Sequence, residues 1–153
     1  MFFDYPGQAS SMAPGNFVVF GELRGDDWEK LVAFMRRERF AAGATVLRAG
    51  DDDPTLYFLA QGEVEVVARA GILGERQLAV ITQGSVFGEI GFFDRRPRTA
   101  TVRALTEAVT FSLRREQFDA MAVWEPAIAR VMLLDLGRVL SRRLRGMLEG
   151  AGR

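Results

Sequence analysis

The chain of 153 residues contains no cysteine and no histidine. Without cysteine there is no disulfide, thiolate nucleophile or iron–sulfur cluster, and without histidine the commonest general base and the commonest metal ligand are missing. Because no nucleophile–base pair is visible, we expect a protein that is not an enzyme and that needs no cofactor. The run 51–53, three aspartates before Pro54, reads as a solvated turn, so we also expect no metal site.

The chain also lacks a net charge, because 20 Lys and Arg residues balance 20 Asp and Glu residues. Zero net charge gives no overall attraction to nucleic acid or to an anionic membrane. No apolar run is long enough to span a bilayer, and residues 1–16 lack a basic segment and are broken by prolines and glycines. We expect a cytoplasmic protein whose partners include neither DNA nor a membrane.

The length and the 48% apolar content predict a single folded domain, which we place at 17–149 behind a loose arm at 1–16. The stretch 26–40, DDWEKLVAFMRRERF, has apolar residues on one helical face and begins with Asp26, a plausible N-cap. It predicts a short amphipathic helix that packs on the domain.

The middle of the chain, residues 40–113, consists of short apolar runs separated by closely spaced glycines. Four of these runs read as strands, at 63–66, 77–81, 99–104 and 109–113. Many short strands joined by glycine turns are typical of an antiparallel roll or barrel. The fold class is therefore expected to be mainly β with flanking helices.

After Leu113 the apolar period becomes helical. One short helix is expected over 115–123, and Pro126 suits the first turn of a longer helix that ends near Glu149, before the stop signals Gly150 and Gly152. The two C-terminal helices are thus placed at about 115–149. An apolar stripe at spacings of three and four follows the longer helix through Leu133, Leu136, Leu140, Leu144 and Met147.

The segment 87–101, FGEIGFFDRRPRTAT, contains groups that suit a phosphorylated sugar. Gly88 and Gly91 let the backbone approach a ligand closely, and a helical turn beginning near Glu89 would point free N–H groups at an anion. Arg98 offers a rigid fork of donors for a phosphate, whereas Glu89 only accepts hydrogen bonds and suits a sugar hydroxyl. A ribose joined to a cyclic phosphate needs both kinds of group.

The run FGEIGFFDRRPRTATV closely resembles the phosphate-binding cassette of cyclic nucleotide-binding domains. That family includes the regulatory subunit of cAMP-dependent protein kinase, cyclic nucleotide-gated channels and the bacterial catabolite activator proteins. The resemblance covers about 17–148 and implies a jelly-roll-like β-roll with an N-terminal helix, a short helix in the cassette and two C-terminal helices. Outside the cassette, turn, strand and helix-start positions of the family are matched by Gly50, Tyr57, Gly62, Phe118 and Pro126.

The resemblance implies that Glu89 accepts the ribose 2′-hydroxyl of cAMP or cGMP and that Arg98 pairs with the cyclic phosphate. Backbone N–H groups near Gly91 and Thr99 would donate to the same phosphate. Gly91 is one departure, because alanine or serine is common at this position in the family. The residues expected around the ligand are Gly88, Glu89, Ile90, Gly91, Arg98, Thr99 and Ala100.

The resemblance places the purine base against apolar strand residues, under a residue of the last helix. Val86 is one candidate contact, and the helix offers Arg143, which could stack on the base, and Leu144. These helix residues read equally well as surface or as a dimer seam. The hydroxyl of Thr99 can reach the exocyclic amine of a guanine held syn, which permits cGMP and does not exclude cAMP.

The sequence shows no helix-turn-helix, channel, kinase or cyclase segment after the long helix. It therefore predicts a stand-alone receptor that passes ligand binding through its C-terminal helix to a partner protein or to a second copy of itself. Two alternatives stay open. One is a structural or scaffold module that keeps the fold without physiological ligand binding, and the other is a transcription regulator that lacks its own DNA-binding domain.

Overall fold

A computed structural model describes residues 23–151, with Ala151 described by its backbone alone. The arm expected at 1–16 lies outside the described residues. In chain order, the elements are α1 (Asp27–Val32), β1 (Arg36–Phe40), β2 (Thr45–Leu47), β3 (Leu56–Gln61), β4 (Glu63–Arg69), a 3₁₀ turn (Gly71–Leu73), β5 (Glu75–Thr82), β6 (Val86–Phe87), α2 (Glu89–Asp94), β7 (Thr101–Ala104), β8 (Ala108–Leu113), α3 (Arg115–Trp124) and α4 (Pro126–Ala151).

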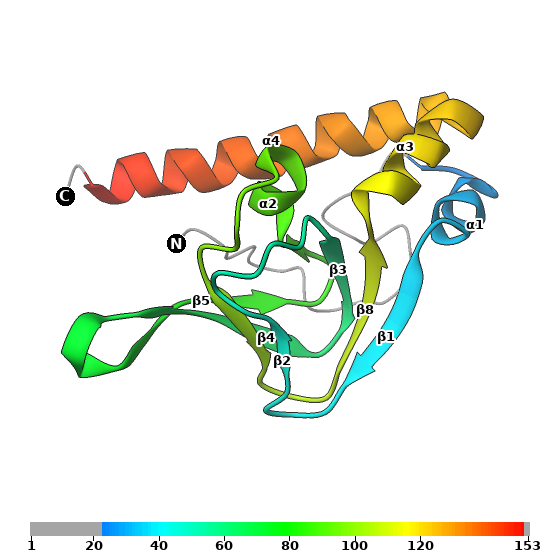
Figure 1. The fold of residues 1–153 in the computed structure, drawn as a ribbon. Helices are drawn as coiled ribbons and strands as arrows, with labels where there is room; N and C mark the ends of the chain where they lie inside the picture. Colours follow the sequence, from blue (N-terminus) through cyan, green and yellow to red (C-terminus); the bar gives the residue numbers. More distant parts are fainter. Residues whose placement is uncertain (1–22, 152–153) are drawn as a thin grey trace.

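The strands form two four-stranded antiparallel sheets, ordered β1-β8-β3-β6 and β2-β7-β4-β5 (Figure 1). Side chains alternate along β4, where Val64 and Val66 are buried while Glu63 is exposed. The buried residues of the second sheet pack against Leu59, Phe87 and their neighbours from the first, which fills the space between the sheets. The predicted β-roll with flanking helices is confirmed.

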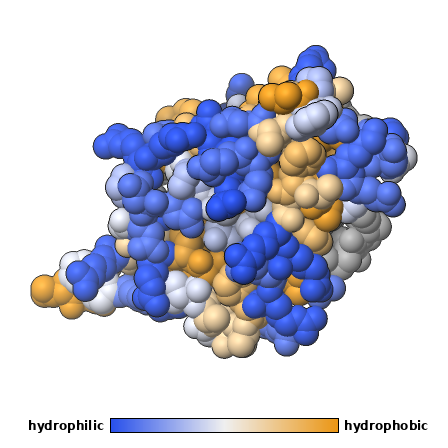
Figure 2. Space-filling view, turned by 45° about the vertical axis from the view of Figure 1, so that its right-hand side comes forward, coloured by the Kyte–Doolittle hydropathy of each residue, from blue (hydrophilic) through white to orange (hydrophobic). Residues whose placement is uncertain are grey.

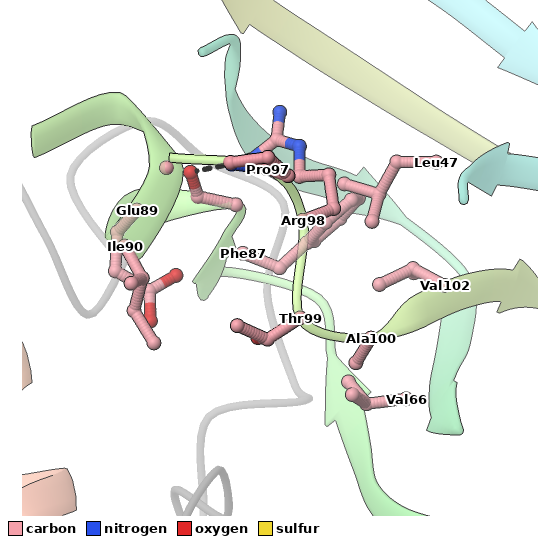
Figure 3. A pocket seen from close by; sticks show the side chains of 12 residues that line it. Leu47, Val66, Phe87, Glu89, Ile90, Pro97, Arg98, Thr99, Ala100 and Val102 are labelled. Carbon is pink, nitrogen blue, oxygen red and sulfur yellow. Dashed lines mark hydrogen bonds between the residues drawn. The ribbon is translucent and has the colours of Figure 1, made fainter. Parts of the chain in front are cut away.

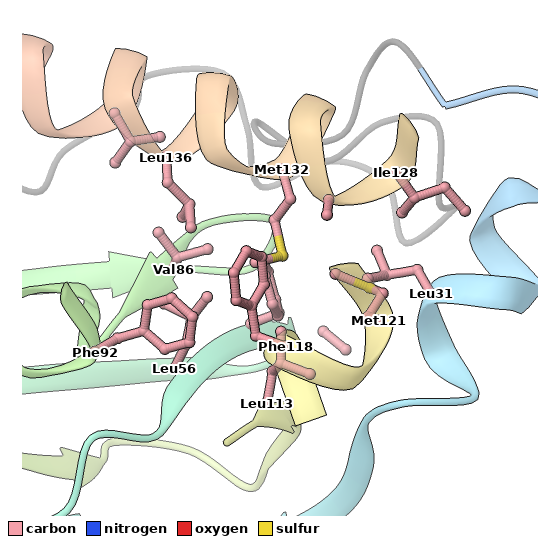
Figure 4. Close-up of a cluster of buried hydrophobic side chains, with 14 of the residues drawn as sticks. Leu31, Leu56, Val86, Phe92, Leu113, Phe118, Met121, Ile128, Met132 and Leu136 are labelled. Atoms are coloured by element: carbon pink, nitrogen blue, oxygen red, sulfur yellow. The ribbon is translucent and has the colours of Figure 1, made fainter. Parts of the chain in front are cut away.

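A second apolar cluster joins the first sheet to the helices (Figure 4). Leu56, Phe58 and Leu113 come from the sheet, and each is fully buried. Burial of a side chain of this size stabilises the fold by about 1.5–3 kcal/mol. The helices contribute Leu31, Phe118, Met121, Ile128, Met132 and Leu136 to the same cluster.

The helix expected over 26–40 is wrong beyond Val32, because Arg36–Phe40 forms β1 instead. This strand pairs in continuous register with β8, and the long-range pairing outweighs the local helical pattern. The β-roll therefore begins at residue 36 rather than 40. Asp26 does precede α1, but its side chain makes no capping hydrogen bond and instead lies 3.7 Å from the amine of Lys30.

The two C-terminal helices are confirmed, although α4 continues to Ala151 and contains Gly150 rather than ending before it. The face of α4 that is buried against the roll consists of Ile128, Met132, Leu136 and Val139. Only Leu136 of the expected stripe lies on that face. The other members of the stripe, Leu133, Leu140, Leu144 and Met147, are exposed or half-buried. No helix among residues 23–151 is long and apolar enough to cross a membrane.

Strands β4 and β5 extend away from the body of the molecule as a hairpin (Figure 1). Its tip is apolar and projects into solvent (Figure 2), with Ile72 104% and Leu73 84% exposed. These two side chains therefore add nothing to either apolar cluster. The cassette lies elsewhere, with α2 and the start of β7 below α4 (Figure 1).

Candidate functional site

All the cassette residues expected around a ligand line one pocket between α2 and the start of β7 (Figure 3): Gly88, Glu89, Ile90, Gly91, Arg98, Thr99 and Ala100. The hollow has about 460 Å³ of empty space, counting its open mouth. The rest of its wall is apolar and comes from Leu47, Val66, Phe87, Pro97 and Val102.

Two glycines give the cassette its shape. Gly88 has a φ of +79° and turns the chain from β6 into α2. A Cβ atom there would lie 2.8 Å from the carbonyl oxygen of Thr55 and 3.0 Å from Nη1 of Arg98. A Cβ atom at Gly91 would lie 3.1 Å from the same nitrogen. Both glycines thus leave room for the guanidinium of Arg98.

Arg98 extends from the loop before β7 toward α2 (Figure 3) and is 6% exposed. Its Nη1 donates to the carbonyl oxygen of Gly88 at 2.8 Å, and its Nη2 donates to that of Thr55 at 2.5 Å. Its Nε is buried and has no hydrogen-bond partner among the described residues. Burial lowers the pKa of Arg98, while Asp53 and Tyr57 oppose the shift. A fixed guanidinium with an unused donor therefore lies in the wall of the pocket.

Glu89, the first residue of α2, is 2% exposed. Its Oε1 lies 2.5 Å from Nη1 of Arg143, which comes from α4 and is 3% exposed. The other Nη of Arg143 donates to the carbonyl oxygen of Val86 at 2.6 Å and approaches Oγ of Ser85 at 3.4 Å. A buried charge needs a partner of opposite sign, and each residue supplies one to the other. This Glu89–Arg143 pair joins α4 to the cassette.

The three residues proposed near the base do not line this pocket. The side chain of Val86 belongs to the apolar cluster under the helices, and its carbonyl oxygen accepts from Arg143. Arg143 lies on the α4 side of Glu89, and Leu144 is 57% exposed. Their contact with a base stays a prediction.

Sequence reasoning missed the apolar wall of the pocket. Val66 lies on the inner face of β4, and the period of two at 63–66 could have marked it. Nothing local in the sequence shows that β2 pairs with β7, which is what brings Leu47 and Val102 together. Within residues 23–151 no group of three or more carboxylates is arranged to hold a metal ion.

The family model of the cyclic nucleotide-binding domain matches residues 37–123, which include the whole cassette and most of the roll. The chain belongs to this family. This family is regulatory rather than catalytic.

Sequence relatives and solved structures agree with this assignment. The chain is 33% identical over 106 residues to a CRP-like cAMP-activated global transcriptional regulator of Mycobacterium tuberculosis, a match that covers 69% of this chain and 46% of that protein. The catabolite activator protein of Thermus thermophilus is 26% identical with a TM-score of 0.77, over 88% of this chain and 62% of that one. The regulatory domain of Toxoplasma gondii protein kinase A, crystallised with cAMP, is 25% identical with a TM-score of 0.61, over 78% of this chain and 46% of that one. This chain spans about half the length of the curated relatives it first matches.

The Glu89–Arg143 pair yields a prediction about stability. Replacing Arg143 by alanine leaves a buried carboxylate unpaired, and the free energy of unfolding should fall by about 3–5 kcal/mol. Arg142→Ala, which alters an exposed neighbour on α4, should change it by no more than about 0.5 kcal/mol. Urea unfolding measures both. The double variant Glu89→Gln/Arg143→Met should recover part of the lost free energy of unfolding, because no unpaired charge is left buried. Equal losses in Arg142→Ala and Arg143→Ala would contradict the pairing.

Proposed function

We propose that this chain is a cyclic nucleotide receptor whose pocket binds cAMP, cGMP or both. The observation that supports the proposal best is that Glu89 and Arg98, two buried charges of opposite sign, line the same open hollow with Gly88 and Gly91. The phosphate would lie against Arg98, the ribose 2′-hydroxyl against Glu89, and the base against the apolar wall. The relatives named above support this choice of ligand, because one is described as cAMP-activated and another was crystallised with cAMP.

Arg98 changes partners in the proposed complex. Without a nucleotide, two of its N–H groups donate to neutral carbonyl oxygens, those of Gly88 and Thr55. A cyclic phosphate carries a negative charge, and charge-assisted hydrogen bonds are roughly twice as strong as neutral ones. The phosphate would therefore compete well for the guanidinium, beginning with the unused Nε. The exposed Thr99 follows Arg98 in the chain, and its hydroxyl supports cGMP as a second ligand beside cAMP.

Titration calorimetry with each nucleotide tests the site directly. Arg98→Ala should weaken binding by about 30- to 5,000-fold, because truncating a buried charged partner costs about 2–5 kcal/mol. Arg96→Ala removes an exposed arginine from the same segment and should leave the affinity unchanged within about threefold. Binding of neither nucleotide to the folded wild-type protein would favour the structural module over the receptor. Equal affinities for wild type and Arg98→Ala would contradict the proposed phosphate contact.

We propose that binding is transmitted through α4. A carboxylate has two oxygens with about four acceptor positions, so Glu89 can keep Arg143 on Oε1 and accept the ribose hydroxyl as well. The nucleotide would then fix the carboxylate that holds Arg143. A ligand shifts a helix only if it binds one arrangement better than the other, and this shared carboxylate supplies the difference.

The part of α4 that responds should be the part near Arg143. Gly137 lies at an exposed position within the helix, with no other residue near the place of a Cβ atom, and the hydroxyl of Ser141 donates to its carbonyl oxygen at 2.8 Å. Helix-interior glycine costs about 1 kcal/mol, and hydroxyl back-bonding of this kind often bends a helix. Beyond Gly137, the buried contacts of α4 come from Val139 and Arg143.

Hydrogen exchange with and without saturating cAMP should therefore show increased protection across residues 138–149. Arg143→Ala should lose this increase, whereas Arg142→Ala should keep it, since Arg142 is exposed and outside the pair. Protection of the cassette serves as the internal sign that the nucleotide is bound. A protected cassette with no change in α4 would refute the proposed transmission.

The exposed face of α4 supports a second copy of the chain as the partner. Leu133, Gly137, Leu140, Leu144 and Met147 follow one another at spacings of four and three residues, which is the seam of a two-helix coiled coil. On this face Leu133 is 41%, Leu144 57% and Met147 55% exposed. Apolar surface of this extent on one helix is typical of an interaction site.

Sedimentation velocity should accordingly show a dimer that Leu144→Glu converts to monomer, because the substitution places two charges in the seam. Val123→Glu is the matched control, since Val123 is 75% exposed on α3, away from the seam. If the wild-type protein stays monomeric in the presence of nucleotide, the dimer is excluded and the partner of α4 would be another protein.

A further inference from the structure

A second hollow lies apart from the nucleotide pocket, where β1 and β3 begin, β8 ends and α3 starts (Figure 1). It has about 750 Å³ of empty space counting its mouth, and its lining is mainly polar. Strand register brings part of that lining together. Arg36 lies opposite Ser112 on β8, and Ser112 lies opposite Tyr57 on β3, so the three side chains form one row across the sheet.

Tyr57 contributes a hydroxyl group to the lining of this hollow. The residue as a whole is 7% exposed. Burial, and then the nearby carboxylates of Asp53 and Glu38, raise the pKa of Tyr57 to about 12, so the hydroxyl keeps its proton and is available as a donor. The hollow therefore contains a protonated hydroxyl that can donate to a ligand.

The charged groups around Tyr57 are of both signs. Arg36 and Arg114 line the hollow, and so do Glu38 and Asp53. Arg36 and Glu38 are loosely paired, at 4.0 Å. Asp53 accepts from Thr55, and Arg114 donates to Gln117, so neither is paired with a charge of opposite sign in these contacts. A simple anion would meet the two carboxylates, and a simple cation would meet the two guanidinium groups. A molecule with a separated positive and negative charge satisfies both sets.

We propose that this hollow is a second ligand site and that it binds a free α-amino acid or a zwitterion of similar size. The carboxylate of the ligand is placed by the guanidinium groups of Arg36 and Arg114 and by the hydroxyl of Tyr57. The ammonium group is placed by Glu38 and Asp53. Guanidinium forks suit carboxylates, and carboxylates accept all the hydrogen bonds that an ammonium group donates.

The second site is connected to the nucleotide pocket through one short segment. Oδ1 of Asp53 accepts from the hydroxyl of Thr55 at 2.6 Å, and the carbonyl oxygen of Thr55 accepts from Arg98 at 2.5 Å. The ring of Tyr57 stacks on Phe87, which precedes Gly88, with ring centres 5.0 Å apart. A ligand that holds Asp53 and Tyr57 therefore acts on both supports of the phosphate arginine. This coupling rests on the proposed nucleotide function, whereas the binding itself does not.

Binding is tested on the wild-type chain without nucleotide, by calorimetry with each standard L-amino acid at up to about 10 mM, well above a dissociation constant of about 1 mM. At least one amino acid should bind, and Tyr57→Phe, which keeps the stacked ring, should weaken that binding about tenfold. Arg36→Ala should weaken it at least as much. Arg37→Ala alters the neighbouring exposed arginine on β1 and should leave it unchanged.

Inorganic phosphate and acetate test whether a negative charge alone binds, and methylamine tests whether a positive charge alone binds. No binding by any amino acid, tighter binding of a probe with one charge, or equal affinity in Tyr57→Phe and wild type would each overturn the site.

The coupling is measured separately, as the dissociation constant of cAMP with and without the saturating amino acid. A change of about threefold or more, matched by the reciprocal change for the amino acid, supports the coupling, and no change refutes it. If cAMP binds and no amino acid binds, the second site alone is refuted. If an amino acid binds and cAMP does not, the nucleotide site alone is refuted.

Discussion

The buried ion pair between Glu89 and Arg143 is the interaction on which the arrangement of this molecule depends most. Both side chains are almost fully buried, and neither charge would be tolerated in that position without the other. The pair joins the first residue of α2 to the second half of α4, which are far apart in sequence. The apolar cluster under α4 also stabilises this region, but apolar contacts are not directional. The ion pair gives the helix a defined position relative to the cassette.

The cassette is built around Arg98, and its sequence shows only part of that arrangement. The pattern of two glycines, a glutamate and an arginine correctly indicated residues that line one pocket. The reason for the glycines is visible only in three dimensions, since the atoms a Cβ would meet belong to Arg98 and to Thr55, which is brought there by β3. The same holds for the partner of Glu89. A glutamate followed 54 positions later by an arginine carries no local signal, and the contact arises from the way α4 lies across α2.

The remaining differences between sequence and structure have the same origin. Residues 36–40 directly follow an amphipathic helical pattern, yet they form an edge strand because they pair in continuous register with β8. The expected leucine stripe on α4 is divided in the structure, since Leu136 is buried while Leu133 and Leu144 are exposed. A helix with two apolar faces does not show in its sequence which face lies against the roll. Local patterns thus predicted four of the strands, the two C-terminal helices and the cassette. Strand order, the buried face of α4 and the second polar hollow required knowledge of which distant segments meet.

Gly137 and Ser141 form a weak turn within α4, between two parts of the helix that are each packed against the rest of the protein. The helix is held before this point by Met132 and Leu136 in the apolar cluster, and after it by Val139 and the charged contact of Arg143. A helix held on both sides of a weak turn bends there before either end detaches. In the proposed transmission, the last part of α4 would move at this turn while the core beneath its first part stays packed. Such a hinge would confine the motion to the few backbone angles around Gly137.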